Sequence, residues 1–261
     1  MNIHDTLPYA IKNGEFELYF QPQVEIATGR LNGVEVLLRW NSTDFGQLTP
    51  PRFISVAEEV GLVLPLSEWF LETACHQAVA WQLQGFPELP IAVNLSAIQF
   101  RHGNLEQIVG NALDDSGLAP YSLELELSES ALQQQIDAGY ADLQYINDRG
   151  VRLSLDDFTV NYSSLSYLKL FNIKKLKLKQ SLVESVADNP VDFDMLSSIM
   201  KVAKSLNIKT IAEGVDNYRI FMYLHDLRCD EAQGGYFARP MSNTEFLQWR
   251  KSRHSEQALA A

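Results

Sequence analysis

The sequence predicts an α/β protein built as a TIM-type barrel whose first strand is antiparallel. The chain has 261 residues, of which 46% are hydrophobic, and single α/β barrels commonly have about 250 residues. Short β-rich runs alternate with helical patterns, which is typical of parallel strands joined by crossover helices. Only a turn at Thr28-Gly29-Arg30 joins the first two β-rich runs. Because this turn leaves no room for a crossover helix, the first strand pair should be antiparallel.

The predicted elements follow in chain order. We expect strands at 17–21, 31–39, 91–95, 123–127, 151–155, 175–179, 209–213 and around Ala232. We expect helices at 51–59, 67–84, 105–114, 131–147, 190–205 and 217–226. No Pro/Gly/Ser-rich linker divides the chain, so residues 1–253 should form a single domain and residues 254–261 a disordered tail.

Composition and charge exclude several classes of partner. A formal net charge of −12 argues against general binding to DNA or to an anionic membrane, because those partners attract clustered lysine and arginine. No run approaches the roughly 18 apolar residues of a membrane span, and the first residues lack the pattern of a secretory signal. Cys75 and Cys229 are too few for a disulfide framework and too isolated for a CxxC site. We expect a soluble cytoplasmic protein.

Five predicted strand segments each deliver an acidic or amide residue, on the strand or just after it. These residues are Glu35, Asn94, Glu126, the pair Asp156 and Asp157, and Glu213. Strand alternation points Glu126, Asp156 and Glu213 inward, and the C-terminal ends of barrel strands are where active sites are usually built. Carboxylates that repel one another are stable together when a positive charge lies among them, and hard oxygen ligands suit divalent cations. The sequence therefore predicts a Mg²⁺ or Mn²⁺ site.

Each of these residues also has an ordinary structural interpretation. Asp156 and Asp157 could cap a helix or form a turn. Glu35 and Arg39 could form a surface ion pair if their segment were helical, but the run Val34-Glu-Val-Leu-Leu favours a strand. Lys177 belongs to a basic cluster that could be a solvated face, although strand alternation places it inside the barrel.

Eight short runs are informative through their order and spacing. They are Glu17-Leu-Tyr-Phe-Gln-Pro22, Glu35-Val-Leu-Leu-Arg-Trp40, Asn94-Leu-Ser96, Glu124-Leu-Glu-Leu-Ser-Glu-Ser130, Asp156-Asp-Phe158, Tyr162-Ser-Ser-Leu-Ser-Tyr-Leu-Lys169, Ala212-Glu-Gly-Val215 and Gln233-Gly234. Together they resemble the EAL-domain family of bacterial cyclic di-GMP (c-di-GMP) phosphodiesterases, from about Ala10 to Trp249.

The resemblance implies a TIM-type barrel with an antiparallel first strand, two Mg²⁺ or Mn²⁺ ions, and hydrolysis of c-di-GMP to linear pGpG. The implied metal ligands are Glu35, Asn94, Glu126, Asp156 and Asp157, with Gln233 completing the site. Glu213 is the implied general base and Lys177 the partner of the attacking water and phosphate, whereas Glu129 is expected to anchor the loop after Asp157. The expected substrate contacts are Gln21, Leu37 and Arg39.

The chain also departs from the family pattern. Thr159-Val160-Asn161 replaces a loop with two glycines, and Lys179 replaces an acid two residues after the strand lysine. Gly235 replaces an aromatic residue, and Asp216 replaces a glutamate. Loss of glycine changes the path of a loop, and an added positive charge opposes metal binding. We therefore expect a phosphodiesterase with reduced turnover.

Two alternatives to an active enzyme stay open at this point. One is a c-di-GMP receptor that binds without cleavage and signals through a regulatory protein partner. The other is a scaffold without nucleotide binding. The resemblance also implies a homodimer that pairs through residues 163–169.

Overall fold

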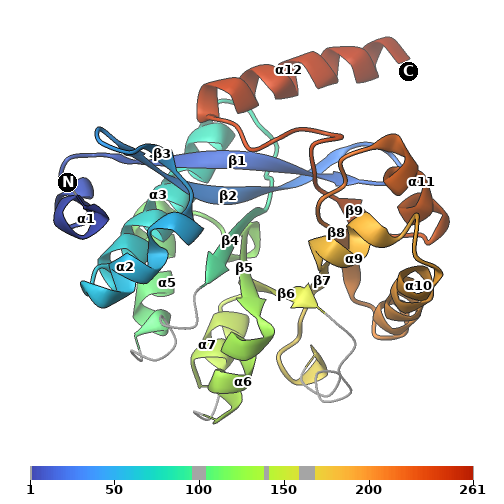
Figure 1. Ribbon diagram of the computed structural model, residues 1–261, viewed down its shortest axis with the longest axis horizontal. Helices are drawn as coiled ribbons and strands as arrows, with labels where there is room; N and C mark the ends of the chain where they lie inside the picture. Colours follow the sequence, from blue (N-terminus) through green and yellow to red (C-terminus); the bar gives the residue numbers. More distant parts are fainter. Residues whose placement is uncertain (1, 96–103, 138–140, 159–167, 261) are drawn as a thin grey trace.

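Eight strands close into a barrel (Figure 1). The computed structural model describes residues 2–95, 104–137, 141–158 and 168–260. The barrel strands are β1 Phe16–Glu25, β2 Leu31–Ser42, β4 Ile91–Leu95, β5 Leu123–Ser128, β6 Arg152–Phe158, β7 Lys175–Leu178, β8 Lys209–Ala212 and β9 Glu231–Ala232. Strand β1 is antiparallel to both of its neighbours, β2 and β9, and the strands from β2 round to β9 pair in parallel. The predicted barrel with an antiparallel first strand is confirmed.

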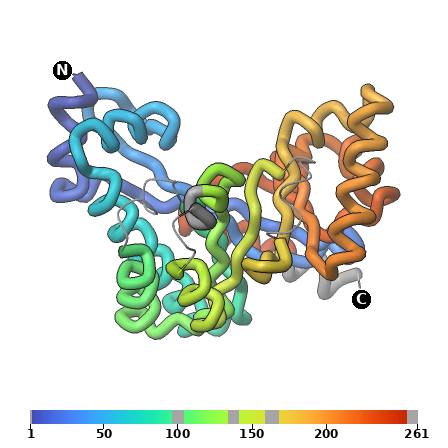
Figure 2. The backbone as a smooth tube through the Cα atoms, turned by 90° about the horizontal axis from the view of Figure 1, so that it is seen from below, coloured from blue at the N-terminus to red at the C-terminus, as the bar shows by residue number. Residues whose placement is uncertain are grey.

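Helices surround the barrel. They are α1 Ile3–Ala10, α2 Ile54–Glu59, α3 Val63–Leu83, α5 Leu105–Ser116, α6 Glu129–Asp137, α7 Ala141–Asp148, α9 Gln180–Ser185, α10 Pro190–Ser205, α11 Tyr218–Asp226 and α12 Asn243–Ala260. Figure 2 shows helices α1 and α2 (blue) and helices α9 and α10 (orange) on opposite sides of the strands. Short 3-10 helices span Pro50–Arg52 and Pro120–Ser122, and β3, Gly46–Leu48, extends β2 outside the barrel. Within the described ranges, no helix is both long and apolar enough to cross a membrane.

Local sequence signals explain where several helices begin and end. The side chain of Asn189 accepts a hydrogen bond from the amide of Val191 at the start of α10, and Pro190 occupies the first turn, where no backbone donor is needed. At the other end of a helix, Gly117 follows α5 with a left-handed φ of 73°. These are the ordinary start and stop residues of helices.

Several elements differ from their predicted limits. The single helix expected at 131–147 is two helices, α6 and α7, on either side of residues outside the described part. Helices α1, α9 and α12 and strand β3 were not predicted. Helix α12 continues to Ala260, where a disordered tail was expected from residue 254. Its Phe246 packs against Phe20 of β1 and Trp81 of α3, with ring centroids 6.0 and 4.8 Å apart. This packing over the barrel could not be read from periodicity.

The apolar core lies between the barrel and its helices, whereas the barrel interior is charged. In β5, Leu123, Leu125 and Leu127 are fully buried in the core cluster. The alternate residues Glu124 and Glu126 are also buried, at 2% and 1% exposure, on the other face of the strand. Buried carboxylates are costly unless they are paired. The interior must therefore supply cations, and β7 does so with Lys175 and Lys177.

Candidate functional site

Lys177 lies at the centre of three carboxylates near the C-terminal ends of the strands. Its Nζ is 2.6 Å from Glu126, 2.7 Å from Glu213 and 3.1 Å from Glu35. These residues come from β7, β5, β2 and the segment after β8. Lys177 is only 1% exposed, so the sequence-based placement of its side chain inside the barrel is correct. The three acids and this lysine form what we call the upper cluster.

Glu35 is held from three sides. The amide of Asn94 donates to its Oε1 over 2.7 Å, and the amide of Gln233 donates to its Oε2. Gln233 also donates to Oε1 of Gln21 over 2.9 Å. Strands β4, β9 and β1 thus bring the predicted residues Asn94, Gln233 and Gln21 to the same carboxylate.

The predicted acids on and after β6 are placed differently from one another. Asp156 is half-buried, and its carboxyl lies close enough to Lys177 and Glu35 for both to shift its pKa. Asp157 is exposed, has a left-handed φ of 54°, and donates its backbone N–H to Asp156 over 2.8 Å. Glu129 is the first residue of α6, directly after β5. The loop that Glu129 was expected to anchor, 159–161, lies outside the described residues.

The three expected substrate contacts lie beside the upper cluster on the antiparallel pair. Gln21 is opposite Glu35 in the β1–β2 register, and Leu37 and Arg39 follow Glu35 on the same face of β2. The guanidinium of Arg39 lies 5.3 Å from the ring centroid of Tyr19 and donates to the carbonyl of Leu38 over 2.8 Å. Leu37 is half-buried. All three side chains therefore lie on the face of the antiparallel pair that carries Glu35.

The segments that follow β8 and β9 meet at a hollow of about 190 Å³ beside Glu213. Val215 donates to the carbonyl of Gln233 over 3.1 Å. A Cβ on Gly234 would overlap the amide nitrogen of Val215, so only glycine fits there. The sequence did not single out Gln180 or Arg239, which also line the hollow. Both are exposed and lie outside the strands, Gln180 at the start of α9, so strand alternation gave no pattern to find them.

Two departures from the family pattern lie in direct contact. The backbone N–H of Gly235 donates to Oδ1 of Asp216 over 2.8 Å, and a Cβ at position 235 would lie 2.9 Å from the same oxygen. The shorter acid and the glycine therefore accommodate each other. Lys179, the other departure, is exposed and lies beyond the end of β7 at Leu178. Alternation in the strand expected at 175–179 would turn Lys179 inward with Lys177, but the strand ends before Lys179.

Burial and charge shift the pKa values of the upper cluster. Burial raises the pKa of Glu126 to about 8, against the opposing effect of Lys177. Burial likewise raises the pKa values of Glu213 and Asp156, again opposed by Lys177. For Lys177, burial lowers the pKa, but Glu126, Glu35 and Glu213 outweigh it and raise the pKa well above its ordinary value. Lys177 therefore stays charged, and Glu126, Glu213 and Asp156 hold protons more tightly than usual.

The donor set fits hard divalent cations. The neighbouring strands β2, β4, β5 and β6 carry the carboxylate and amide oxygens of Glu35, Asn94, Glu126 and Asp156, and Oε1 of Glu126 is buried without a hydrogen-bond partner. In the described part of the chain, no three or more His, Cys, Asp or Glu side chains are grouped as metal ligands would be. Lys177 takes the central position instead. A cation would compete with Lys177 for the same carboxylate oxygens.

Comparison with known proteins places the chain in a family. A model of the EAL domain matches residues 4–240. In Pseudomonas aeruginosa, MucR, a bifunctional diguanylate cyclase/cyclic di-GMP phosphodiesterase, is 38% identical over 245 residues, which are 94% of this chain and 36% of MucR. The cyclic di-GMP phosphodiesterase NbdA of the same organism is 34% identical over 241 residues, 92% of this chain and 31% of NbdA. The chain thus spans about a third of the length of these curated relatives.

A solved structure has the same arrangement of strands and helices. The PaMucR phosphodiesterase in complex with c-di-GMP matches with a TM-score of 0.89 at 36% sequence identity, covering 94% of this chain and 100% of that one. The family match covers far more than half of the chain, and the barrel that carries the upper cluster is common to both structures. The chain therefore belongs to the EAL domain family.

Proposed function

We propose that this domain hydrolyses c-di-GMP to linear pGpG in the cytoplasm, using Mg²⁺ or Mn²⁺ held at the C-terminal end of the barrel. The observation that carries the proposal is the convergence of Glu35, Glu126 and Glu213 on Lys177. Relatives that share this family are named as c-di-GMP phosphodiesterases, which supports the substrate and the reaction.

The residues divide the work of phosphodiester hydrolysis among them. Glu35, Asn94, Glu126 and Asp156 would hold the cations, and Asp157 would join them from the exposed end of β6. Bound divalent cations supply neutralisation of phosphate charge and an acidified water. Glu213 has a pKa raised mainly by burial, which makes its carboxylate a stronger proton acceptor than an ordinary glutamate. Lys177 provides a permanent positive charge toward the phosphate.

The substrate would lie over the antiparallel pair. Arg39 can hold a phosphate through its planar guanidinium, Gln21 can hydrogen-bond a polar edge, and Leu37 can contact an apolar face. A homodimer and a regulatory protein partner belong to the same proposal. Most of segment 163–169, which the resemblance assigns to dimer pairing, lies outside the described residues.

The purified chain, incubated with c-di-GMP and Mn²⁺, should release pGpG, detected by chromatography. Binding of c-di-GMP without product would contradict hydrolysis and favour the receptor. Absence of both binding and product would favour the scaffold. Because Asp157 is exposed at the end of β6 and the sequence departs from the family pattern just after it, we expect turnover below that of an enzyme with the family loop.

Mn²⁺ binding should release a proton near neutral pH. With a pKa of about 8, the Glu126 carboxyl is largely protonated below that pH, and a cation must displace its proton. We expect Mn²⁺ affinity to rise about tenfold per pH unit up to about pH 8 and then level off. Calorimetric titration in buffers of different ionisation enthalpy measures both effects, and Glu126→Gln is the control. An affinity independent of pH would contradict this assignment.

The raised pKa of Glu126 also predicts that the stability of the metal-free fold decreases as the pH rises. The folded pKa of Glu126 lies above its ordinary value of 4.5, so the folded chain binds this proton more tightly than the unfolded chain. Its contribution to stability is complete below about pH 4.5 and is lost as the pH rises through about 8. Chemical denaturation with a metal chelator present would measure this decline.

A further inference from the structure

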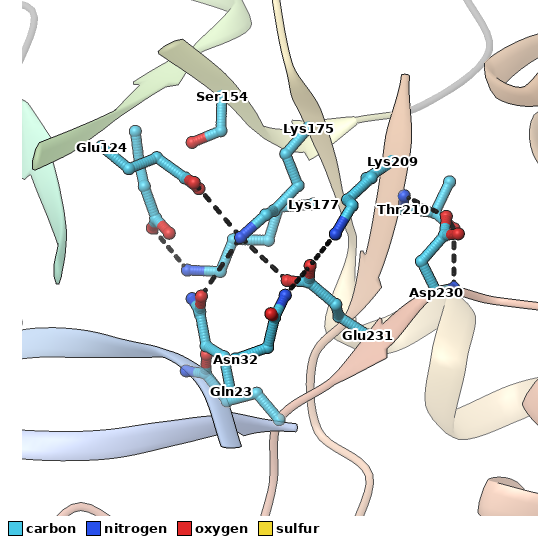
Figure 3. A network of polar contacts seen from close by, with 12 residues as sticks. Gln23, Asn32, Glu124, Ser154, Lys175, Lys177, Lys209, Thr210, Asp230 and Glu231 are labelled. Carbon is cyan, nitrogen blue, oxygen red and sulfur yellow. Dashed lines mark hydrogen bonds and ion pairs between the residues drawn. The ribbon is translucent and has the colours of Figure 1, made fainter. Parts of the chain in front are cut away.

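A second charged layer lies inside the barrel beneath the upper cluster (Figure 3). Lys175 precedes Lys177 by two residues on β7, so both side chains point inward. Its Nζ lies 2.9 Å from Glu231 and 3.2 Å from Glu124, and it donates to Oε1 of Gln23 over 3.3 Å. Lys175 is 7% exposed, and Gln23 is 1% exposed. The proposed chemistry does not use this layer.

Lys175 can act only as a hydrogen-bond donor. Burial lowers its pKa, but Glu124 and Glu231 outweigh burial and raise the pKa above its ordinary value. An ammonium has three donors and no acceptor. The amide group of Gln23 must therefore present its oxygen to Lys175, which turns its nitrogen toward the other side of the barrel.

That nitrogen sets the orientation of the next amide. Nε2 of Gln23 donates to Oε1 of Gln233 over 3.3 Å, so Gln233 must turn its own nitrogen upward. This nitrogen donates to Oε2 of Glu35 and to Oε1 of Gln21. Gln21 in turn donates to the carbonyl of Ala238 over 3.1 Å. All donors along this chain run in one direction, from Lys175 to the upper cluster.

Gly33 makes room for the middle of the chain. It lies opposite Gln23 in the β1–β2 register. A Cβ at position 33 would lie 2.8 Å from Oε1 of Gln23, closer than any carbon tolerates. The amide of Gln23 can reach Lys175 because this position has no side chain.

We propose that Lys175 is a positioning residue for the metal site, acting through Gln23 and Gln233 to aim an amide donor at Glu35. The inference rests on the proposed function in that Glu35 is taken to hold a cation. Without the charge of Lys175, Gln23 is free to flip, and Gln233 can then turn its oxygen toward the Glu35 carboxylate. The partial negative charge of that amide oxygen would repel the carboxylate, and Glu35 would lose its fixed orientation.

We call the hydrogen-bonded chain from Lys175 through Gln23 and Gln233 to Glu35 the relay. The test uses Gln23→Met, which removes the relay without changing any charge. Loss of a group that orients a metal ligand typically weakens metal affinity by about 10- to 100-fold, and we expect about tenfold weaker Mn²⁺ binding by calorimetry. The kcat measured at saturating Mn²⁺ should return close to the wild-type value, because the defect lies in cation affinity. Gly33→Ala, which displaces the same amide, should behave alike.

Lys209→Met is the matched control. Lys209 pairs with the same Glu231 over 3.3 Å, and within the described ranges it has no hydrogen bond to Gln23. It is largely exposed, so the fold should tolerate its loss. We expect its Mn²⁺ affinity to stay within about twofold of wild type, since the relay is intact. Equal weakening in Gln23→Met and Lys209→Met would overturn the relay and indicate a general disturbance of the lower layer.

A readout independent of metal separates this inference from the proposed function. The side-chain amide protons of Gln233 should be protected from exchange in the wild type and lose protection in Gln23→Met, as measured by nuclear magnetic resonance. Unchanged protection would overturn the relay even if the enzyme is active. Lost protection in the variant, together with a wild-type chain that neither binds Mn²⁺ nor cleaves c-di-GMP, would support the relay and refute the proposed function.

Discussion

Replacing Glu35 with alanine is expected to lower the turnover of c-di-GMP by at least about 1000-fold while the chain stays folded. Loss of several kcal/mol of cation-based charge stabilisation corresponds to about three powers of ten in rate. Glu35 is the carboxylate on which the largest number of predicted site residues meet: Asn94, Gln233 and Lys177 all contact it. Product formation from c-di-GMP and Mn²⁺ affinity should be measured on the same preparation.

The fold should survive this change because Lys177 keeps two of its three carboxylates. Asn94 is exposed at the barrel mouth, so water can satisfy the amide that Glu35 leaves. Glu35 also raises the pKa values of Glu126 and Glu213, so its removal relieves repulsion between buried acids. A Glu35→Ala variant that retains turnover would exclude Glu35 as a cation ligand.

A surface acid provides the matched control for Glu35→Ala. Asp114 of α5 pairs with Arg149, which directly follows α7, and neither is a predicted site residue. Asp114→Asn removes one carboxylate charge, as Glu35→Ala does, and an exposed ion pair contributes only about 0–1 kcal/mol. Turnover should therefore stay at the wild-type level. A loss in both variants would point to net charge, not to coordination, as the cause.

Strand alternation predicts the barrel and the inward-facing half of the site. The period of two directs Glu126 and Lys177 to the same interior, and the structure joins them at 2.6 Å. Neighbouring strand ends explain why Asn94 and Glu35 meet, since β4 pairs with β2 in parallel. These relations follow from alternation within each strand and from the parallel pairing of strands that neighbour each other along the chain.

Contacts between residues far apart in the chain were not predictable in the same way. Gln23 and Gln233 are 210 positions apart and meet only because β9 closes the barrel onto β1. The same closure brings Glu231 to Lys175. The inward direction of Lys175 was implied by its alternation with Leu176, but nothing in the sequence named its partners. Closure of the ring is the missing information.

Alternation also failed where an element ended earlier than expected. Lys179 shares the parity of Lys177, yet β7 ends at Leu178 and Lys179 precedes helix α9. Because Lys179 lies outside the strand, alternation does not place its positive charge beside the proposed metal site. Asp216 and Gly235 show the converse case, since two separate departures in the sequence compensate through one hydrogen bond. The effect of such a substitution depends on the residue that it contacts, which a comparison of single positions in the sequence does not show.

Lys177→Met should destabilise the metal-free fold by about 3–5 kcal/mol, because it leaves the ionised acids of the upper cluster buried without their shared cation. Lys177 is 1% exposed, and Glu35 and Glu126 are 3% and 1% exposed, so water cannot replace it. Urea unfolding with a chelator present measures the effect. Lys209→Met, which removes a largely exposed lysine, is the control and should cost less than about 1 kcal/mol.

The sign of the Mn²⁺ effect separates the two roles of Lys177. If cations and Lys177 compete for the same oxygens, the variant should bind Mn²⁺ more tightly than the wild type, and Mn²⁺ should restore more stability to the variant, by RT ln(1 + [Mn²⁺]/Kd). Turnover should nevertheless stay low, because the charge directed at the phosphate is gone. A stability loss that Mn²⁺ leaves unchanged would show that the three acids do not form a cation site, and restored turnover would remove Lys177 from the proposed chemistry.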